Sequence, residues 1–287
     1  MIGTIGAIAG DIIGSCYESH KYRTKNYDFE LFTDRSSITD DSIHTFAIMD
    51  WLLHTDRSVY ACKQSLIKWS RHYPMAGYGP MMYRWIKGEN NYDPYDSFGN
   101  GSAMRVSPVA WVSDSLEHTM DLALMSAVPT HNHSEGIKGA QAVASCIFLN
   151  RIGESKETIK EFIKKRFKYN LDFTYDDIKK DHRFECTCQY SVPRAIITWL
   201  ASDSYEDCIR KAVSLGGDCD TEACIAGSIC NANKDTQISD NIITEIVEHG
   251  YNLNKYMIDI INEFRDAYEI PIENKLGVEN LANRLEI

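Results

Sequence analysis

The stretch ITDDSIHTFAIMDWLL, residues 38–53, decides the fold class. Thr39 stands before Asp40 and Asp41, and this order is typical of a helix N-terminus, where a hydroxyl caps the first amides and acids complement the helix dipole. The apolar residues that follow form one helical stripe: Ile43, Phe46, Ala47, Met49 and Leu53. We therefore predict a helix with one face in the core.

The same periodicity continues along the rest of the chain. We expect helices in the apolar opening segment, around 66–69, over 135–150, over 159–167, near 196–200, around 208–214, and in pieces between 242 and 268. Sustained strand alternation is absent from the sequence, and no Gly/Ser-rich or Pro-rich linker divides it. We predict an all-α fold, a compact multi-helix orthogonal bundle forming a single domain over 1–287.

One segment interrupts the helical pattern. Four of the 7 prolines and several glycines lie between Pro74 and Pro108, among many aromatic residues. A long irregular segment inside a helical domain is often functional, and aromatic side chains favour burial or ligand contact. The alternative is a surface excursion without a function.

Composition restricts the class of protein. The chain has 287 residues, 44% apolar and 25% charged, which are values of a globular protein. Its net charge of -11 argues against bulk binding of nucleic acid or of a membrane surface. The 9 cysteines are odd in number and irregularly spaced, so we expect reduced thiols and a cytoplasmic protein. The opening segment lacks the basic residues of a signal peptide, and no heptad pattern indicates a coiled-coil partner, so we expect a monomer.

A second acidic motif lies about 180 residues after the first, in Gly217-Asp218-Cys219-Asp220-Thr221. Either motif alone would fit a helix cap. Together they favour one site for hard divalent cations, because carboxylate and hydroxyl oxygens suit Mg²⁺, Mn²⁺ or Ca²⁺ and not zinc or copper. Two cations sharing the carboxylates would account for the number of acids, and a single cation is the alternative.

Two further motifs suggest ligand contacts. In Ser97-Phe98-Gly99-Asn100-Gly101-Ser102-Ala103-Met104-Arg105, glycine and asparagine tolerate positive φ, so successive amides could converge on an anion. The alternative is an ordinary Asn-Gly turn. We expect Arg105 to hold this loop to the acidic centre. His131 and His133 flank an asparagine at a helix start and are candidates for ligand contact.

Two acids lie in the otherwise apolar first helix. Asp11 and Glu18 are seven residues apart and so share one helix face. A buried acid must be paired or functional. We interpret Asp11 as half of a buried ion pair, whereas Glu18, nearer the end of the apolar run, could reach a cleft.

In this order along the chain, the motifs resemble those of the ADP-ribosylglycohydrolase family, also called the dinitrogenase-reductase-activating-glycohydrolase family. The resemblance implies an all-helical fold of that type with a centre of two Mg²⁺ or Mn²⁺ ions. Its implied ligands are Thr39, Asp40, Asp41, Asp218, Asp220 and Thr221. Ser42 stands where threonine is common in the family and keeps the hydroxyl.

The resemblance also implies an activity, hydrolysis of the glycosidic bond at ribose C1″ of an ADP-ribosylated protein or small molecule, which releases ADP-ribose. The implied substrate-binding residues are Ser97, Phe98, Gly99, Asn100, Gly101, Ser102 and His131. Such cleavage needs a positioned water and help for the leaving group. Our hypothesis is that Asp40 or Asp41 acts on the water and that Glu18, as in relatives acting on O-linked ADP-ribose, assists at the scissile bond.

Two other functions stay open at this point. A non-catalytic ADP-ribose-binding or crystallin-like protein would keep the fold and release no product. A metal-dependent phosphoesterase would use the same cations and release AMP or phosphate instead of ADP-ribose. The acceptor group also stays open, among arginine, serine, a nucleic-acid base and O-acetyl-ADP-ribose.

Overall fold

The chain folds into helices throughout the residues that the computed structural model describes, 4–181 and 183–268. The elements are α1 Ile5–Glu18, α2 Asp40–His54, α3 Val59–His72, α4 Pro80–Ile86, α5 Gly101–Met104, α6 Val109–Val112, α7 Leu116–Ala127, α8 Ser134–Arg151, α9 Lys156–Phe167, α10 Tyr175–Lys179, α11 Cys188–Leu200, α12 Tyr205–Leu215, α13 Cys219–Cys230, a 3-10 turn Lys234–Thr236, α14 Asp240–His249 and α15 Lys255–Tyr268. Within these ranges strand pairing is limited to one antiparallel bridge between Gly99 and Thr187. The all-α prediction is confirmed.

The helices begin where local chemistry predicts. Thr39 caps α2, and its Oγ1 accepts a hydrogen bond from the Asp41 amide at 3.3 Å. The C-terminal region divides at Gly250, whose φ of 72° lies in the left-handed region that ends helices without strain in glycine.

The segment 74–108 is less irregular than predicted, because it contains α4 and α5. Pro80 starts α4 in the first turn, where its missing N–H costs no hydrogen bond.

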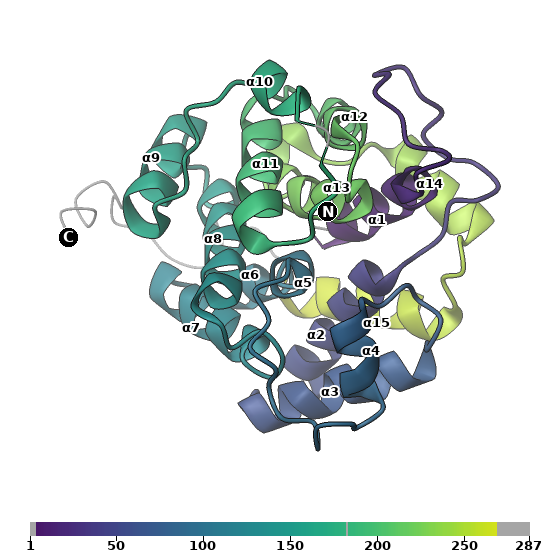
Figure 1. Cartoon of the computed structure of the whole chain (residues 1–287), viewed down its shortest axis with the longest axis vertical. Coiled ribbons are helices and arrows are strands. Elements are labelled where there is room, and N and C mark those ends of the chain that lie inside the picture. Colours follow the sequence, from purple (N-terminus) through teal and green to yellow (C-terminus); the bar gives the residue numbers. More distant parts are fainter. Residues whose placement is uncertain (1–3, 182, 269–287) are drawn as a thin grey trace.

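The packing of α1 against α13 lies at the centre of the molecule. These helices come from opposite ends of the chain and lie side by side (Figure 1). Their backbones approach closely at glycines: a Cβ on Gly10 would lie 2.3 Å from the Ala223 carbonyl oxygen, and one on Gly14 would lie 2.5 Å from Cα of Asp220. No larger residue fits at either position. This contact brings the first helix to the start of α13.

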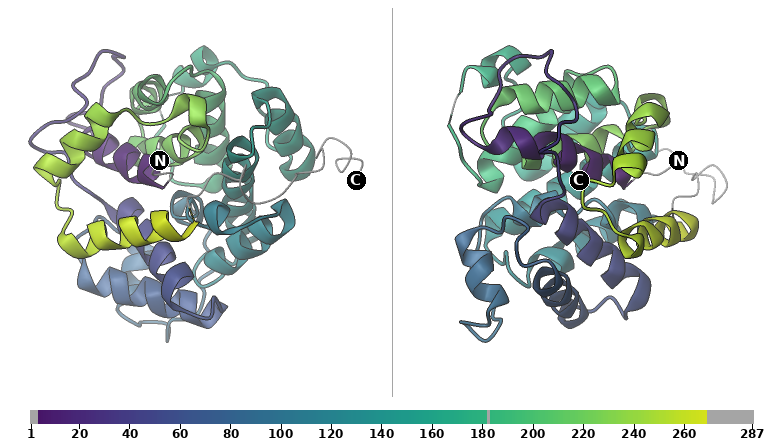
Figure 2. Two further views of the ribbon diagram at one scale, coloured as in Figure 1. Left: turned by 180° about the vertical axis from the view of Figure 1, so that it is seen from behind. Right: turned by 90° about the vertical axis from the view of Figure 1, so that its right-hand side faces the viewer.

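The other helices pack around this pair. α11 and α12 contact α13, α8 contacts α5 and α7, and α2 contacts α3. α15 lies along α2 on the face seen from behind (Figure 2). The buried hydrophobic side chains form one large cluster, in which Trp51, Trp69, Trp85 and Trp199 are almost completely enclosed.

Three sequence-based predictions concern the chain as a whole. The domain predicted over 1–287 extends beyond the described residues and stays a prediction. No described helix is both long enough and apolar enough to cross a lipid bilayer. The 9 cysteines are all free thiols, and only Cys186 is exposed.

Candidate active site

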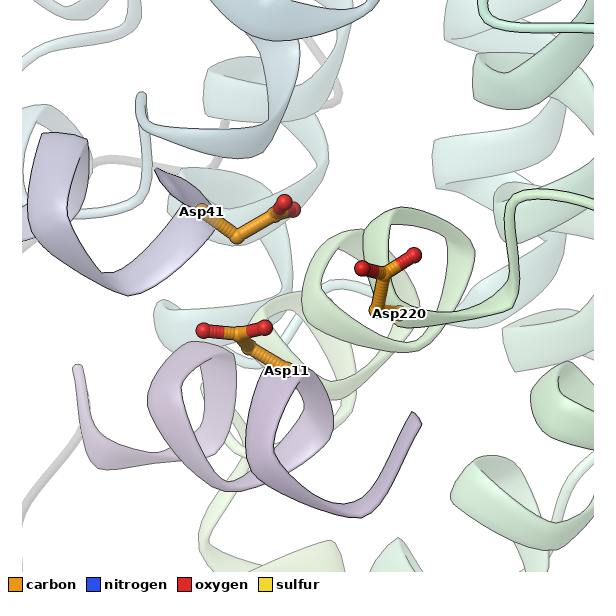
Figure 3. Close-up of side chains that lie close together, drawn as sticks. All are labelled: Asp11, Asp41 and Asp220. Atoms are coloured by element: carbon orange, nitrogen blue, oxygen red, sulfur yellow. The ribbon is translucent and has the colours of Figure 1, made fainter. Parts of the chain in front are cut away.

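Carboxylates from three helices converge at the junction of α1, α2 and α13. Asp11, Asp41 and Asp220 each place an oxygen within 4.8 Å of the others, and Figure 3 shows the three side chains pointing toward one another. Glu18, Asp218 and Asp220 form a second group with the same spacing. We call these the two carboxylate triads. Asp220 belongs to both, so the predicted meeting of the two acidic motifs is present in the structure.

Asp11 corrects one interpretation of the sequence. It is completely buried, but it accepts hydrogen bonds and forms no ion pair with a described residue. Its donors are the Thr39 amide at 2.9 Å, Thr39 Oγ1 at 2.7 Å, the Ser42 amide at 3.1 Å and Ser42 Oγ. Three of these donors share Oδ2 and only Thr39 Oγ1 donates to Oδ1, so Oδ1 retains capacity to accept. Asp11 therefore holds Thr39 and Ser42 in place and orients the start of α2.

Asp41 has the opposite environment. Its Oδ2 accepts from Thr221 Oγ1 at 3.3 Å and lies equally far from Thr39 Oγ1, whose single hydrogen goes to Asp11. Its Oδ1 is buried without a described hydrogen-bond partner. A buried carboxylate oxygen without a donor is costly unless a cation completes it. The all-oxygen donor set around Asp41, with Asp218 and Asp220 also buried, fits a hard divalent cation.

The acids raise one another's proton affinity. Burial, followed by repulsion from neighbouring carboxylates, raises the pKa of Glu18, Asp41 and Asp220. Burial also raises the pKa of Asp11 against the effect of its hydrogen bonds. The same two causes, burial first and then repulsion chiefly from Asp11, raise the pKa of Asp40 to about 8. Bound positive charge would relieve this repulsion.

Asp40 stands apart from its neighbour Asp41. It is half-buried, belongs to neither triad, and its carboxylate accepts no hydrogen bond from another described residue. The segment before α4 lies beside it, since a Cβ on Gly77 would be 3.6 Å from Asp40 Oδ1. Asp40 therefore has an unengaged carboxylate at the edge of the acidic site.

Asn100, and not Arg105, joins the loop to the acidic centre. The Asn100 side-chain amide donates to Asp218 Oδ2 at 2.7 Å and to Ser191 Oγ at 2.9 Å, and its backbone amide donates to the Cys186 carbonyl at 2.8 Å. The prediction for Arg105 was wrong, because its guanidinium donates to the Ser126 carbonyl and to Thr130. The contact of Asn100 with Ser191 was not predicted, because no motif or spacing in the sequence links these two residues.

The glycines of the loop are needed for close packing, because their backbone conformation is one that other residues also adopt. Neither Gly99 nor Gly101 has positive φ, and Asn100 has φ −73°. The Gly99 amide already donates to Ser97 Oγ at 3.1 Å. A Cβ on Gly101 would lie 3.0 Å from Nε2 of His131, so glycine gives the imidazole its space. The expectation of positive φ in this loop was wrong, whereas the anion contact of its amides stays a prediction, and the loop does adjoin Asp218.

The remaining predicted contact residues differ in accessibility. Phe98 is 46% exposed and its ring lies 5.3 Å from that of His133. His131 is 5% exposed beside the loop. Ser102 is fully buried and its hydroxyl donates to the Gly136 carbonyl at 2.7 Å, so its predicted ligand contact stays a prediction for the backbone of this residue.

Comparisons with known proteins agree with this architecture. Residues 3–234 match the family model described as ADP-ribosylglycohydrolase. The chain is 31% identical over 147 residues to an uncharacterized protein of Archaeoglobus fulgidus, an alignment covering 46% of this chain and 48% of that one. It is 27% identical over 143 residues to the ADP-ribosyl-(dinitrogen reductase) glycohydrolase of Rhodospirillum rubrum, covering 47% and 45%. These alignments span about half the length of the two relatives.

A third relative is matched over more of its length. The chain is 25% identical over 304 residues to ADP-ribosylhydrolase ARH3 of Homo sapiens, covering 79% of this chain and 83% of that one. A solved structure titled ADP-ribosylglycohydrolase-related protein complex has the same fold, with a TM-score of 0.66 at 17% identity, covering 92% and 96% of the two chains.

Proposed function

The chain belongs to the ADP-ribosylglycohydrolase family, and from this premise we propose that it is a metal-dependent hydrolase that releases ADP-ribose from ADP-ribosylated proteins or small molecules. The observation that carries the proposal is the pair of carboxylate triads sharing Asp220. These triads adjoin the 97–101 loop through the hydrogen bond that Asn100 donates to Asp218. We expect the protein to act as a monomer in the cytoplasm.

The proposed cofactors are two Mg²⁺ or Mn²⁺ ions. The oxygens of Asp41, Asp218 and Asp220 would hold them, with the Thr39 and Thr221 hydroxyls beside Asp41. When bound, such cations position ribose hydroxyls and increase the acidity of a water molecule. Asp220 belongs to both triads, so its one buried charge could serve both cations, and their positive charge would reduce the repulsion among the acids.

The two aspartates at the start of α2 have different proposed roles. Asp41 is enclosed and lies in a triad, so it holds a cation. Asp40 is half-buried and has an unengaged carboxylate, so it accepts the proton of the attacking water. In the balanced reaction, the water oxygen bonds to C1″ while the bond from C1″ to the acceptor breaks. One proton of the water passes to Asp40, Glu18 gives its proton to the departing acceptor, and the proton on Asp40 then restores Glu18 through solvent.

Glu18 is the proposed group at the scissile bond. It ends α1, is half-buried, and has a pKa raised first by burial and then by Asp218. A raised pKa favours the protonated form of the carboxyl group, and that form can donate its proton to a leaving oxygen. Among acceptors we therefore favour an O-linkage, as to a serine hydroxyl.

The test is release of free ADP-ribose from matched peptides ADP-ribosylated on serine or on arginine. With Mg²⁺ or Mn²⁺ present we expect release from the serine peptide, and EDTA should abolish it. Glu18→Gln should reduce turnover on the serine peptide by about 100-fold, the usual scale for loss of a general acid. Release of AMP instead would identify a phosphoesterase, and binding of ADP-ribose without any product would identify a binding protein.

A further inference from the structure

Arg105 is a buried cation without an acidic partner. It follows α5, is 0% exposed, and forms no ion pair with any described residue. Its Nη2 donates to the Ser126 carbonyl at 2.7 Å and to Thr130 Oγ1 at 2.9 Å, whereas Nε and Nη1 have no described partner. Burying an unpaired guanidinium costs free energy of folding, which suggests that Arg105 has a role beyond packing that involves the groups it contacts.

Thr130 connects Arg105 to His131. Its Oγ1 lies 2.7 Å from Nδ1 of His131 and receives the hydrogen bond from Arg105. A guanidinium can only donate, so the threonine oxygen acts as acceptor toward Arg105, and its own hydrogen needs a second partner. Of these two partners, only the imidazole nitrogen can accept it. The Tyr95 hydroxyl also lies beside Thr130, and its own hydrogen is donated to the Met82 sulfur at 3.4 Å. A phenol oxygen is a weaker acceptor than a neutral imidazole nitrogen at 2.7 Å, so the Thr130 hydrogen goes to Nδ1 of His131.

This polarity fixes the histidine tautomer. Nδ1 accepts a hydrogen bond and is unprotonated, so the hydrogen of a neutral ring is on Nε2. Burial, followed by the nearby charge of Arg105, lowers the pKa of His131 well below its usual range and keeps the ring neutral. Nε2 points toward the loop, where it would be 3.0 Å from a Cβ on Gly101 and 3.6 Å from one on Gly99, and it has no hydrogen-bond partner among the described residues.

We propose that Arg105 and Thr130 are positioning residues that hold His131 as the neutral Nε2–H tautomer, which donates a hydrogen bond to a substrate oxygen at the 97–101 loop. The identity of that oxygen, a phosphate or hydroxyl oxygen of ADP-ribose, rests on the proposed function. The orientation of the ring does not, because it follows from three residues of the protein alone. A donor fixed in this way is ready before the ligand arrives and requires no protonation step.

The test combines a tautomer measurement with ligand affinity. Long-range proton–nitrogen spectra of the full-length protein, labelled with ¹⁵N-histidine and saturated with Mg²⁺, distinguish the two tautomers, and loss of signals in His131→Gln assigns the ring. We expect the Nε2–H form in the unmodified protein. Thr130→Val should lose this preference and weaken ADP-ribose binding by about three- to tenfold, the contribution of one hydrogen bond. Thr130→Ser should restore both.

Thr198→Val is the matched control, since Thr198 is also fully buried and its hydroxyl has no described partner. It should leave spectrum and affinity unchanged. A His131 with its hydrogen on Nδ1 in the unmodified protein overturns the proposal without use of any variant. Unchanged affinity in a folded Thr130→Val protein overturns the positioning role. If the unmodified protein binds no ADP-ribose, the proposed function fails, and the spectrum still decides the tautomer.

Discussion

Asp220 is the residue whose loss should affect the site most. It is shared by both triads, whereas Glu18 and Asp218 belong to one. We expect Asp220→Asn to weaken Mg²⁺ or Mn²⁺ binding by about 100-fold or more, because loss even of an outer hydrogen bond to a metal ligand costs about 10- to 100-fold. Titration calorimetry measures this, with exposed Asp121→Asn as the control. Equal losses in Asp220→Asn and Glu18→Gln would contradict a shared ligand.

Asn100 acts at the residue scale through Asp218. Its amide donates to Asp218 Oδ2 at 2.7 Å, so Asn100→Ala should weaken metal binding by about tenfold while the fold is retained. Ser102→Ala, two residues away, removes a bond to the Gly136 carbonyl and should cost about 1 kcal/mol of stability without a change in metal affinity. The paired calorimetric titrations and thermal melts of these two variants separate the roles. Similar metal affinities in both would show that Asn100 does not hold Asp218.

At the scale of elements, the approach of α1 to α13 positions the acids. A Cβ on Gly10 would meet the Ala223 carbonyl at 2.3 Å, a distance that requires the backbones to separate. Gly10→Ala should lower the free energy of unfolding by about 3 kcal/mol or more, as overpacking does, and weaken metal binding. Chemical denaturation measures the first effect.

The control for this prediction is Gly79→Ala. Gly79 has nothing within 4 Å of a built Cβ and a φ of −59°, so an alanine fits there. As the residue before α4 it should lose no more than about 1 kcal/mol, the value of a helix cap. If Gly10→Ala were as stable as Gly79→Ala, the close approach of the helices would not be required.

At the scale of the whole molecule, stability should depend on metal and pH together. Without metal, the raised pKa values mean that the folded protein binds protons more tightly than the unfolded chain, so its stability is highest at low pH and is lost as pH rises. The pKa of Asp40, raised from its ordinary 3.8 to about 8, sets the pH range over which this stability is lost. In EDTA we expect the melting temperature to fall between pH 5 and pH 8.

Metal should reverse this loss. Mg²⁺ or Mn²⁺ at about 100 times its Kd should raise the melting temperature at pH 8 by about 5 °C or more, because it binds only the folded state. Asp41→Asn should show a smaller pH dependence in EDTA and a smaller gain with metal, since an amide neither titrates nor repels. Differential scanning calorimetry checks both. A melting temperature in EDTA that rises from pH 5 to pH 8 would contradict the account of the acids.

The sequence by itself determined the features that depend on neighbouring residues. The period of apolar residues determined the helices, and Thr39 before Asp40 and Asp41 determined the start of α2. The motifs in their order also indicated the family, which the match over residues 3–234 confirms. Each of these features lies within a few residues of chain, where spacing and capping chemistry act directly.

Only the tertiary structure decided which groups meet. It gave Asp11 four hydrogen-bond donors instead of the expected ion pair, joined Asn100 to Asp218, and placed Arg105 behind Thr130 and His131. These contacts join segments that are far apart in the chain, and their distances follow from how closely α1 approaches α13 and how α5 packs on α8. Local pattern sets where a helix begins, but the side chains that fill the space between helices set where its residues come to lie.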